Sequence, residues 1–328
     1  MRLPYRQCVT PETARPDLAV PTILHDGVGR TPSGARWIEE LPALVERAAR
    51  RWDLTLGEPF RDGASAWVAP ARTVDGRAAV LKVGFPHDEA RHEADALRAW
   101  DGRGTVRLWA HDPQDWALLL EQVVPGAPMT AVKAVPASEL LAAGAAVHRA
   151  LVTACATDEP GLPGLPHMAD VCRAWSHTLL DRAGRAAAEG ELDVDGGLVE
   201  HAHELLRELP TTGAAAVVHG DLNPGNLLLG PDDRWVAIDP KPMRGDPAYD
   251  LWPLLEQVDS PFRSADPARL LRERTAVAAD AAGLDPQRVA AWALARSVEA
   301  ALWRWDELGD LAGAQRELDQ AAVWAALA

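Results

Sequence analysis

The chain has 328 residues, of which 48% are hydrophobic and 25% are charged. This composition is that of an ordinary globular protein and the length exceeds a usual single domain, so we expect two lobes or domains around one cleft. A peptide hormone, a coiled coil and a long disordered chain are excluded. The net charge is −15, which argues against nucleic acid as the main partner and favours a cationic small molecule.

The cysteines and the N-terminus indicate the compartment. Cys8, Cys155 and Cys172 form neither a CxxC pair nor an even framework, which is typical of reduced thiols and suggests no zinc site. The first twenty residues lack a continuous apolar core, and the longest small or apolar runs, such as the one from Leu141, are too short to span a bilayer. We therefore predict a cytoplasmic protein without a membrane segment.

Residues 1–124 are predicted to form a strand-rich N-terminal lobe. Residues 1–30 are rich in Pro, Gly and polar residues and are predicted to be irregular. Apolar residues at spacings of three and four predict a helix over 35–52, with Pro42 shifting or kinking its first turn. The later patterns predict strands over 54–60, 66–73 and 78–83, an amphipathic helix over 87–100, and strands over 106–111 and 116–124.

Residues 125–328 are predicted to form a mainly helical C-terminal lobe, which begins at the break Pro125-Gly126-Ala127-Pro128. Between Val217 and Asp239 the pattern changes to strand, loop, strand, turn, strand. The whole is an α+β, bilobal plan with a small antiparallel sheet in the first lobe and a cleft at the joint. Helices are predicted over 138–151, 170–188, 197–209 and 286–308, with a last helix after Gly313.

The most informative segment is VVHGDLNPGNLLL, residues 217–229, a polar loop between two apolar strands. In a phosphoryl-transfer site, Asp221 would accept the proton of a substrate hydroxyl and Asn226 would offer its amide oxygen to Mg²⁺. Pro224-Gly225 would supply the turn that brings them together. A chance polar loop with an Asx turn explains this segment about equally well.

Charged residues beside two other apolar strands favour the first interpretation. The β run Trp235–Asp239 ends in an acid, and a hairpin over 227–238 would return that carboxylate to the loop, where it can bridge a metal to triphosphate oxygens. Lys82 is a lone charge in the strand VLKV. It is either an edge lysine with a solvated head or the lysine that holds the α and β phosphates. Glu93 on the next helix would orient it by an ion pair, with Glu89 as the competing candidate.

A turn of small residues at 62–66 precedes the strand of Lys82. Such a turn lets backbone N–H groups, here near Gly63 and Ser65, approach phosphates, although by itself it is an ordinary hairpin turn. The order of the motifs is more specific than any one of them. It runs from the small-residue turn through the strand lysine, the helix glutamate, an apolar strand and the HxDxxxxN loop to the strand aspartate.

These motifs resemble the aminoglycoside phosphotransferase and choline-kinase branch of the protein-kinase-like fold, over about residues 54–255. The loop HGDLxPGN is close to the catalytic-loop pattern of that branch. Within it, AIDPKP followed by GDPAYDL, and VLKVGFPH with Glu89 and Glu93, resemble the streptomycin 6-phosphotransferase and hydroxyurea phosphotransferase group. The Pro-Lys-Pro after Asp239 departs from other aminoglycoside kinases. It leaves the role of Lys241 open between contact with nucleotide phosphates and simple solvation.

The resemblance implies a role for each matching residue. Asp250 would bind the backbone of the catalytic loop, Asp246 would cap the following helix, and His219 would be a packed loop anchor rather than an acid-base group. The residues implied to handle nucleotide and metal are Asp221 as catalytic base, Asn226 and Asp239 as Mg²⁺ ligands, Lys82 as phosphate lysine, and the backbone of Glu121 to Val123 facing adenine.

The resemblance also implies an ATP- and Mg²⁺-dependent phosphotransferase that moves the γ-phosphate to a hydroxyl of a small molecule, with an aminoglycoside such as streptomycin as the first candidate. From Asp246 to Ala328 there are fourteen acids, eight Arg and no Lys. Acids beside aromatic rings suit an ammonium or guanidinium ligand, or they form a solvated face over a Trp-containing core. The acids and the aromatic residue in question are Glu299, Trp303, Asp306 and Glu307.

Two other functions compete with this one. The first is a metabolic kinase that acts on hydroxyurea, an amino alcohol or a sugar, and it would differ only in the acceptor pocket. The second is a catalytically dead nucleotide-binding protein, which would keep the fold but is expected to have lost at least one of the four charged or chelating positions.

Overall fold

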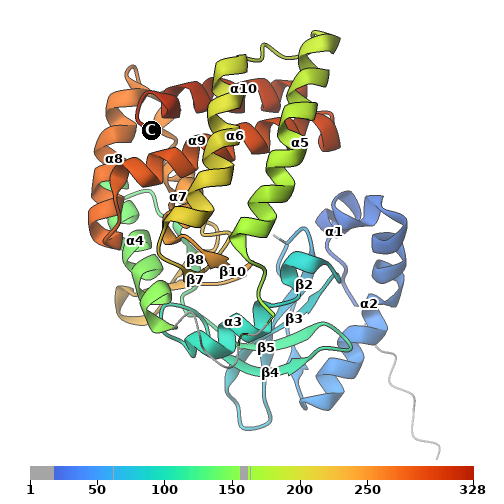
Figure 1. Cartoon of the computed structure of the whole chain (residues 1–328). Coiled ribbons are helices and arrows are strands. Elements are labelled where there is room, and N and C mark those ends of the chain that lie inside the picture. Colours follow the sequence, from blue (N-terminus) through green and yellow to red (C-terminus); the bar gives the residue numbers. More distant parts are fainter. Residues whose placement is uncertain (1–17, 62, 156–161, 163) are drawn as a thin grey trace, which may run out of the picture. The chain divides into compact units, whose positions relative to one another are not determined.

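The structure is a computed structural model that describes residues 18–61, 63–155, 162 and 164–328 (Figure 1). The chain divides into two compact units. The described part of the first covers residues 18–61, 63–85 and 112–117, and that of the second covers most of residues 86–111 and 118–328. A strand-rich first unit and a helix-rich second unit agree with the predicted α+β plan. The lobe boundary at residues 124 and 125 stays a prediction, and Cys8 lies outside the described residues.

Helix α2 (Pro32–Arg51) is the long helix of the first unit, close to the predicted 35–52. Thr31 begins it, because its side-chain oxygen accepts a hydrogen bond from the Gly34 N–H at 3.0 Å. The helix starts a turn earlier than predicted and continues through Pro42, which therefore lies in its middle rather than in its first turn. One face is buried, through Trp37, Ile38, Leu41, Val45 and Ala48.

The chain before α2 is more regular than its composition predicts. A short helix α1 (Thr22–Asp26) and a 3-10 turn η1 (Val28–Arg30) replace the irregular segment that was predicted over these residues. Leu24 is fully buried, and the indole N–H of the buried Trp67 donates to the Ala19 carbonyl at 3.0 Å. A five-residue helix held by such tertiary contacts leaves no periodic pattern, which explains the wrong prediction.

Strands β1 (Thr55–Leu56), β2 (Ala66–Arg72) and β3 (Ala78–Gly84) form the predicted antiparallel meander. The register places Val68 opposite Lys82. Gly76, in the turn between β2 and β3, has φ +83°, a conformation that favours glycine. Strand β1 is shorter than the predicted 54–60, because only isolated hydrogen bonds, such as Phe60 N–H to Val68 O at 2.8 Å, continue beyond it.

The second unit begins with a broken helical segment. The helix predicted over 87–100 is instead a 3-10 turn η2 (Asp88–Ala90) followed by α3 (Glu93–Trp100). Glu89 and Glu93 therefore lie on different elements. Strands β4 (Leu108–Asp112) and β5 (Ala117–Glu121) are adjacent and fall within a few residues of their predicted ranges.

Helices dominate the second unit, with α5 and α6 packed side by side (Figure 1). The apolar periods of the sequence did not predict α7 and α8, because α7 is short and three of the six residues that α8 buries are alanines, which give a weak apolar signal. The others lie near their predicted ranges. The helices are α4 (Ala137–Ala154), α5 (Met168–Glu189), α6 (Gly196–Thr212), α7 (Leu251–Gln257), α8 (Pro267–Ala282), α9 (Pro286–Trp303) with a following π-turn η7 (Arg304–Leu308), and α10 (Leu311–Ala325).

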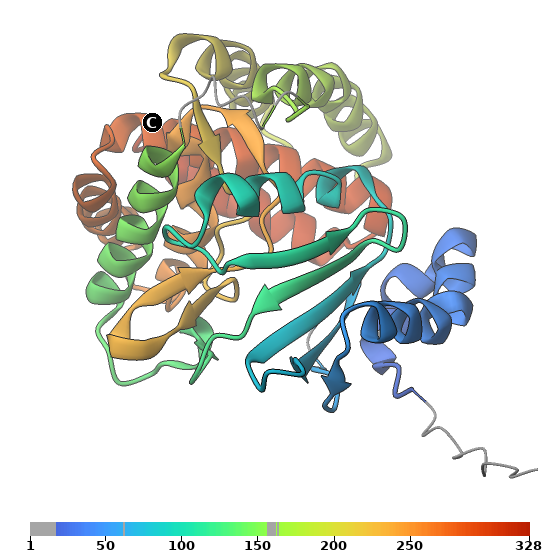
Figure 2. The same cartoon turned by 90° about the horizontal axis from the view of Figure 1, so that it is seen from below.

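Short strands hold the polar loop at both ends. Strands β8 (Leu227–Leu229) and β9 (Trp235–Ala237) form the predicted hairpin, seen in gold beside α4 in Figure 2, with the two-residue β6 (Ala127–Pro128) on the other side of β8. Strand β7 (Ala216–Val218) instead pairs with β10 (Met243–Gly245). Because two separate small sheets hold its ends, the loop over 219–226 has a defined course.

Two predictions about the whole chain can be compared with the described residues. Cys155 and Cys172 are buried and form no disulfide, and burial raises the pKa of the Cys172 thiol to about 12. Among the helices that the structure describes, none combines the length and the apolar content that a bilayer crossing requires.

Candidate active site

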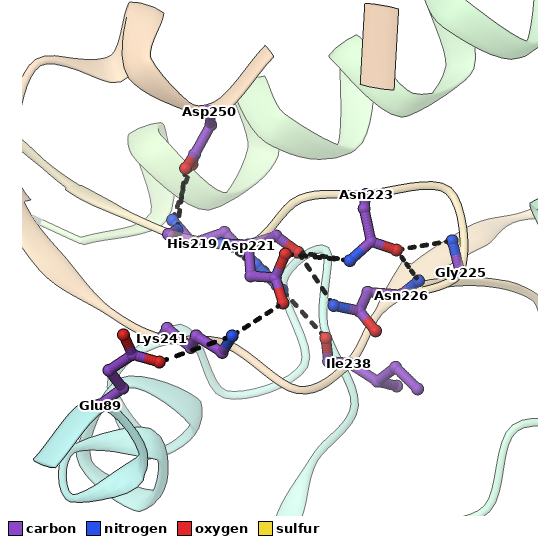
Figure 3. Close-up of polar contacts among 10 residues, drawn as sticks. Glu89, His219, Asp221, Asn223, Gly225, Asn226, Ile238, Lys241 and Asp250 are labelled. Carbon is purple, nitrogen blue, oxygen red and sulfur yellow. Dashed lines mark hydrogen bonds and ion pairs between the residues drawn. The ribbon is translucent and has the colours of Figure 1, made fainter. Parts of the chain in front are cut away.

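Two buried acids stabilise the polar loop and the turn after it, and Figure 3 shows the first of them, Asp250, beside the loop. The two carboxylate oxygens of Asp250 accept the N–H groups of His219 at 2.7 Å and Gly220 at 2.8 Å. Asp246 caps the 3-10 turn η5 (Pro247–Asp250) by accepting the Ala248 N–H at 3.0 Å. The predicted roles of Asp250 and Asp246 are both confirmed by these bonds.

His219 is a packed, hydrogen-bonded anchor of the loop, as predicted. Its fully buried ring stacks on Trp100, with the centroids 6.3 Å apart and the planes within 10°. Nδ1 accepts the Asp221 N–H at 3.3 Å, so Nε2 carries the proton and donates to the Ile238 carbonyl at 3.0 Å. Burial lowers the pKa of His219 against the opposing pull of Asp250 and the other carboxylates. Both ring nitrogens are hydrogen-bonded to the backbone, so neither is available to a substrate.

Asp221 presents a partly exposed carboxylate, with 28% of its side chain accessible. The Asn223 amide donates to Oδ1 at 3.0 Å, and Lys241 Nζ lies 3.3 Å from Oδ2. The Asn223 Oδ1 accepts the N–H groups of Gly225 at 2.8 Å and Asn226 at 3.2 Å, which closes an Asx turn. The predicted site did not include Asn223. Its place directly before Pro-Gly is the signal that could have indicated this positioning role.

Asn226 and Asp239 bring two oxygen donors to the same end of the loop. The Asn226 amide N–H₂ donates to the Asp221 carbonyl at 2.9 Å, so Oδ1 is the atom with which Asn226 would bind a metal. Ile238 N–H donates to the Asn226 carbonyl at 2.9 Å, so the end of the hairpin lies beside Asn226. Asp239 is the next residue along the chain. Amide and carboxylate oxygens are ligands that Mg²⁺ takes together with phosphates and water. In the described part of the chain, no three His, Cys, Asp or Glu side chains form a closed cage.

Lys241 lies against the loop and pairs with two acids. Its Nζ is 3.3 Å from Asp221 Oδ2 and 3.6 Å from Glu89 Oε2 (Figure 3). Burial lowers the pKa of Lys241, but these carboxylates outweigh burial and hold the pKa above its ordinary value. The Lys241 N–H donates to the His219 carbonyl at 2.8 Å. The Lys241 carbonyl would be 1.9 Å from a Cβ at Gly220, where φ is +83°, so only glycine fits there.

Comparison with known proteins assigns the family. The sequence model of the aminoglycoside/hydroxyurea antibiotic resistance kinase family matches residues 51–309. The chain belongs to this family. It is 33% identical to a streptomycin 6-kinase of Streptomyces glaucescens, over 88% of this chain and 89% of that protein. It is also 33% identical to a hydroxyurea phosphotransferase of Kitasatospora aureofaciens, over 89% and 81%. The chain is therefore a small-molecule kinase, as the motifs implied.

Solved structures share the fold of this kinase. A macrolide 2'-phosphotransferase from Brachybacterium faecium superposes with a TM-score of 0.56 at 20% identity, covering 87% of this chain and 98% of that one. A choline kinase from Streptococcus pneumoniae gives a TM-score of 0.58 at 14% identity, covering 86% and 99%. These similarities confirm the bilobal, protein-kinase-like α+β fold class.

The other predicted site residues of the kinase are distributed over both units. Lys82 lies in β3 and Glu93 begins α3, and the exposed fractions of these two residues are only 9% and 4%. Charged residues that are so deeply buried need partners, which makes a purely solvated role for Lys82 untenable. Gly63 and Ser65 lie just before β2, Glu121 ends β5, and Val123 follows two residues later.

The C-terminal acids that were candidates for acceptor contacts are paired within the protein. Arg182 of α5 lies 2.9 Å from Asp306, 3.1 Å from Glu307 and 3.6 Å from Glu299. Arg185 lies 2.7 Å from Asp306. Burial raises the pKa of Glu299 to about 7. These pairs indicate that the acids stabilise the fold rather than contact the acceptor. The count of charges over residues 246–328 missed this, because Arg182 and Arg185 lie in α5.

Proposed function

We propose that this kinase uses ATP and Mg²⁺ to transfer the γ-phosphoryl group to a hydroxyl of an aminoglycoside, with streptomycin as the first acceptor. The observation that carries the proposal is the partly exposed carboxylate of Asp221, which is held by Asn223 and Lys241 and followed on the same loop by Asn226. The choice of acceptor is supported by family membership and by the 33% identity to a streptomycin 6-kinase over most of both chains. The net charge of −15 suits a cationic acceptor.

In this proposal the second unit supplies the chemistry. Asp221 accepts the hydroxyl proton as the acceptor oxygen attacks the γ-phosphorus. Asn226 Oδ1 and the Asp239 carboxylate are the groups that hold magnesium, which when bound neutralises charge on the phosphate oxygens. The backbone from Glu121 to Val123 faces adenine. A cytoplasmic location, where ATP is available, is part of the proposal.

The other predicted site residues would position the triphosphate. Lys82 binds the α and β phosphates, and Glu93 orients the lysine through an ion pair. The backbone N–H groups near Gly63 and Ser65 cover the phosphates. The proposed lobes are residues 1–124 and 125–328.

A second acceptor has comparable support. The chain is as similar to a hydroxyurea phosphotransferase as to a streptomycin 6-kinase, at 33% identity in each case. We therefore propose hydroxyurea as the alternative acceptor at the same nucleotide site. The two acceptors differ in charge, so the dependence of the transfer rate on salt concentration distinguishes them. Transfer to a cationic aminoglycoside weakens as the Debye length shrinks below about 10 Å, whereas transfer to neutral hydroxyurea does not.

A nucleotide-release screen tests the acceptor. ADP formation is measured with fixed Mg²⁺ and ATP over streptomycin, other aminoglycosides, hydroxyurea, choline, homoserine and simple sugars. We expect turnover with streptomycin to exceed the rest. Exclusive use of choline or a neutral sugar would contradict the acceptor and leave the kinase assignment standing. ATP-dependent thermal stabilisation without turnover on any acceptor would instead favour a catalytically dead nucleotide-binding protein.

Two substitutions test the roles of the acids. Asp221→Ala should keep Mg²⁺–ATP binding while transfer falls by about 10² or more, the scale for losing a general base. Asp239→Ala should weaken Mg²⁺-dependent nucleotide binding as well as turnover. Asp233→Ala, in the turn between β8 and β9, is the matched control and should change neither. Small and equal effects of Asp221→Ala and Asp239→Ala would place the active site elsewhere.

A further inference from the structure

Lys241 is built into the catalytic loop more firmly than a solvated lysine would be. It lies between Pro240 and Pro242, its N–H donates to the His219 carbonyl at 2.8 Å, and its carbonyl packs against Gly220. The backbone position of the side chain is therefore fixed relative to the loop. The chain has only three lysines, at 82, 133 and 241, so a lysine at this place contrasts with the general use of arginine elsewhere.

The ammonium of Lys241 lies beside the oxygen of Asp221 that is available to a substrate. Asn223 donates to Oδ1 of Asp221, whereas Oδ2 contacts no donor other than Lys241 in the described part of the chain. A general base lies about 3 Å from the hydroxyl whose proton it takes, and the attacked atom lies about 3–3.5 Å from that hydroxyl oxygen. A flexible ammonium 3.3 Å from the base is therefore within reach of the oxygens on the transferring group.

We propose that Lys241 is a catalytic residue that binds an oxygen of the γ-phosphoryl group and stabilises its charge during transfer. The proposal rests on the proposed function. In the step, the acceptor oxygen forms a bond to the γ-phosphorus, and the bond from that phosphorus to the bridging oxygen breaks. The hydroxyl proton goes to Asp221, and the nucleoside diphosphate leaves with the electron pair. Charge is spread over the equatorial phosphoryl oxygens in such transition states, which is where a mobile cation has its effect.

Glu89 is a positioning residue in this account. Its carboxylate, on the 3-10 turn η2, lies 3.6 Å from Nζ and is 68% exposed. The ammonium is thus shared between two carboxylates before the nucleotide arrives. It moves onto the phosphoryl oxygen when the acceptor hydroxyl takes its place at Asp221 Oδ2. If Lys241 served only to hold Asp221 in place, the ammonium would stay there and the triphosphate would not affect it.

Kinetics of substituted enzymes separate these two roles. Lys241→Met should lower kcat by about 10², the scale for losing one donor to the transition state, while the acceptor KM stays within about threefold. Lys241→Arg keeps the charge and should recover a large part of the rate. Glu89→Gln leaves the ammonium in place and should cost much less than Lys241→Met. A Lys241→Met enzyme within about threefold of wild type, or a Lys241→Arg enzyme as slow as Lys241→Met, would overturn the proposal.

Amine labelling gives a readout that needs no turnover. The wild-type chain is treated with an amine-acylating reagent and Mg²⁺, with either ADP or a non-hydrolysable ATP analogue. Cleavage after arginine places each lysine on its own peptide, namely residues 78–91, 108–149 and 235–244. A charge-assisted contact with the γ-phosphate should slow acylation of Lys241 about tenfold with the analogue relative to ADP. Lys82 should be protected by both nucleotides, and Lys133 by neither.

The labelling pattern also separates this proposal from the proposed function. Equal acylation of Lys241 with the two nucleotides, together with protection of Lys82, would overturn the role of Lys241 and leave the nucleotide site standing. Absence of protection at Lys82, with no turnover on any acceptor, would overturn the proposed function and the role of Lys241 with it.

Discussion

Removal of the Asp250 carboxylate should destabilise the protein strongly, because this one side chain satisfies two buried backbone donors. The exposed fraction of Asp250 is 1%, and its oxygens accept the N–H groups of His219 at 2.7 Å and Gly220 at 2.8 Å. A hydrogen bond to a charged group contributes about 1.5–3 kcal/mol. Asp250→Ala removes two of these hydrogen bonds and leaves both buried N–H groups without an acceptor. We therefore expect the free energy of unfolding to fall by about 3–6 kcal/mol. Asp250→Asn keeps one acceptor and should lose about half as much.

Urea unfolding followed by circular dichroism measures the loss, and an exposed cap provides the control. Asp285 accepts the Gln287 N–H at 3.0 Å at the start of α9, and Asp285→Ala should cost about 1 kcal/mol. Hydrogen exchange at the His219 and Gly220 amides should accelerate in Asp250→Ala, and transfer activity should fall because the loop loses its anchor. If Asp250→Ala were no less stable than Asp285→Ala, the two bonds would not hold the loop and the reasoning would be refuted.

Other perturbations have equally definite outcomes. Gly220→Ala places a Cβ 1.9 Å from the Lys241 carbonyl, so urea unfolding should show a clear loss of stability, and wild-type stability would contradict that close approach. Burial raises the pKa of Glu256 from 4.5 to about 7, so the folded protein binds this proton more tightly than the unfolded chain and stability falls as the pH rises through that interval. Glu256→Gln should flatten the fall in urea midpoints, and an unchanged slope would refute this account. Arg182→Met should lower the melting temperature more than Arg185→Met, because Arg182 is 12% exposed and Arg185 is 52% exposed. Equal melting temperatures would show that the less exposed ion pairs of Arg182 add no more stability than those of Arg185.

Local patterns in the sequence predicted those parts of the site that depend on chain order and on neighbouring residues. The loop from His219 to Asn226 lies between two apolar strands, and the hairpin after it returns Asp239 to its end. Strand alternation and turn residues act over a few positions, so a single sequence reveals them. The anchoring role of Asp250 followed from a family resemblance, which carries information about contacts that local patterns lack.

Long-range pairing was decided by the tertiary structure alone. Strand β7 pairs with β10, a strand that no local pattern predicted. Helix α8 packs against α4, and the C-terminal acids are neutralised by Arg182. Lys241 lies beside Glu89, which is far away in sequence, and only the packing of the elements brings these two charges together. The sequence alone shows which residues are charged, and the period of an element predicts on which of its faces each charge lies. Which opposite charge approaches within 4 Å depends on how the elements pack, and that packing is set by the sum of many weak apolar contacts.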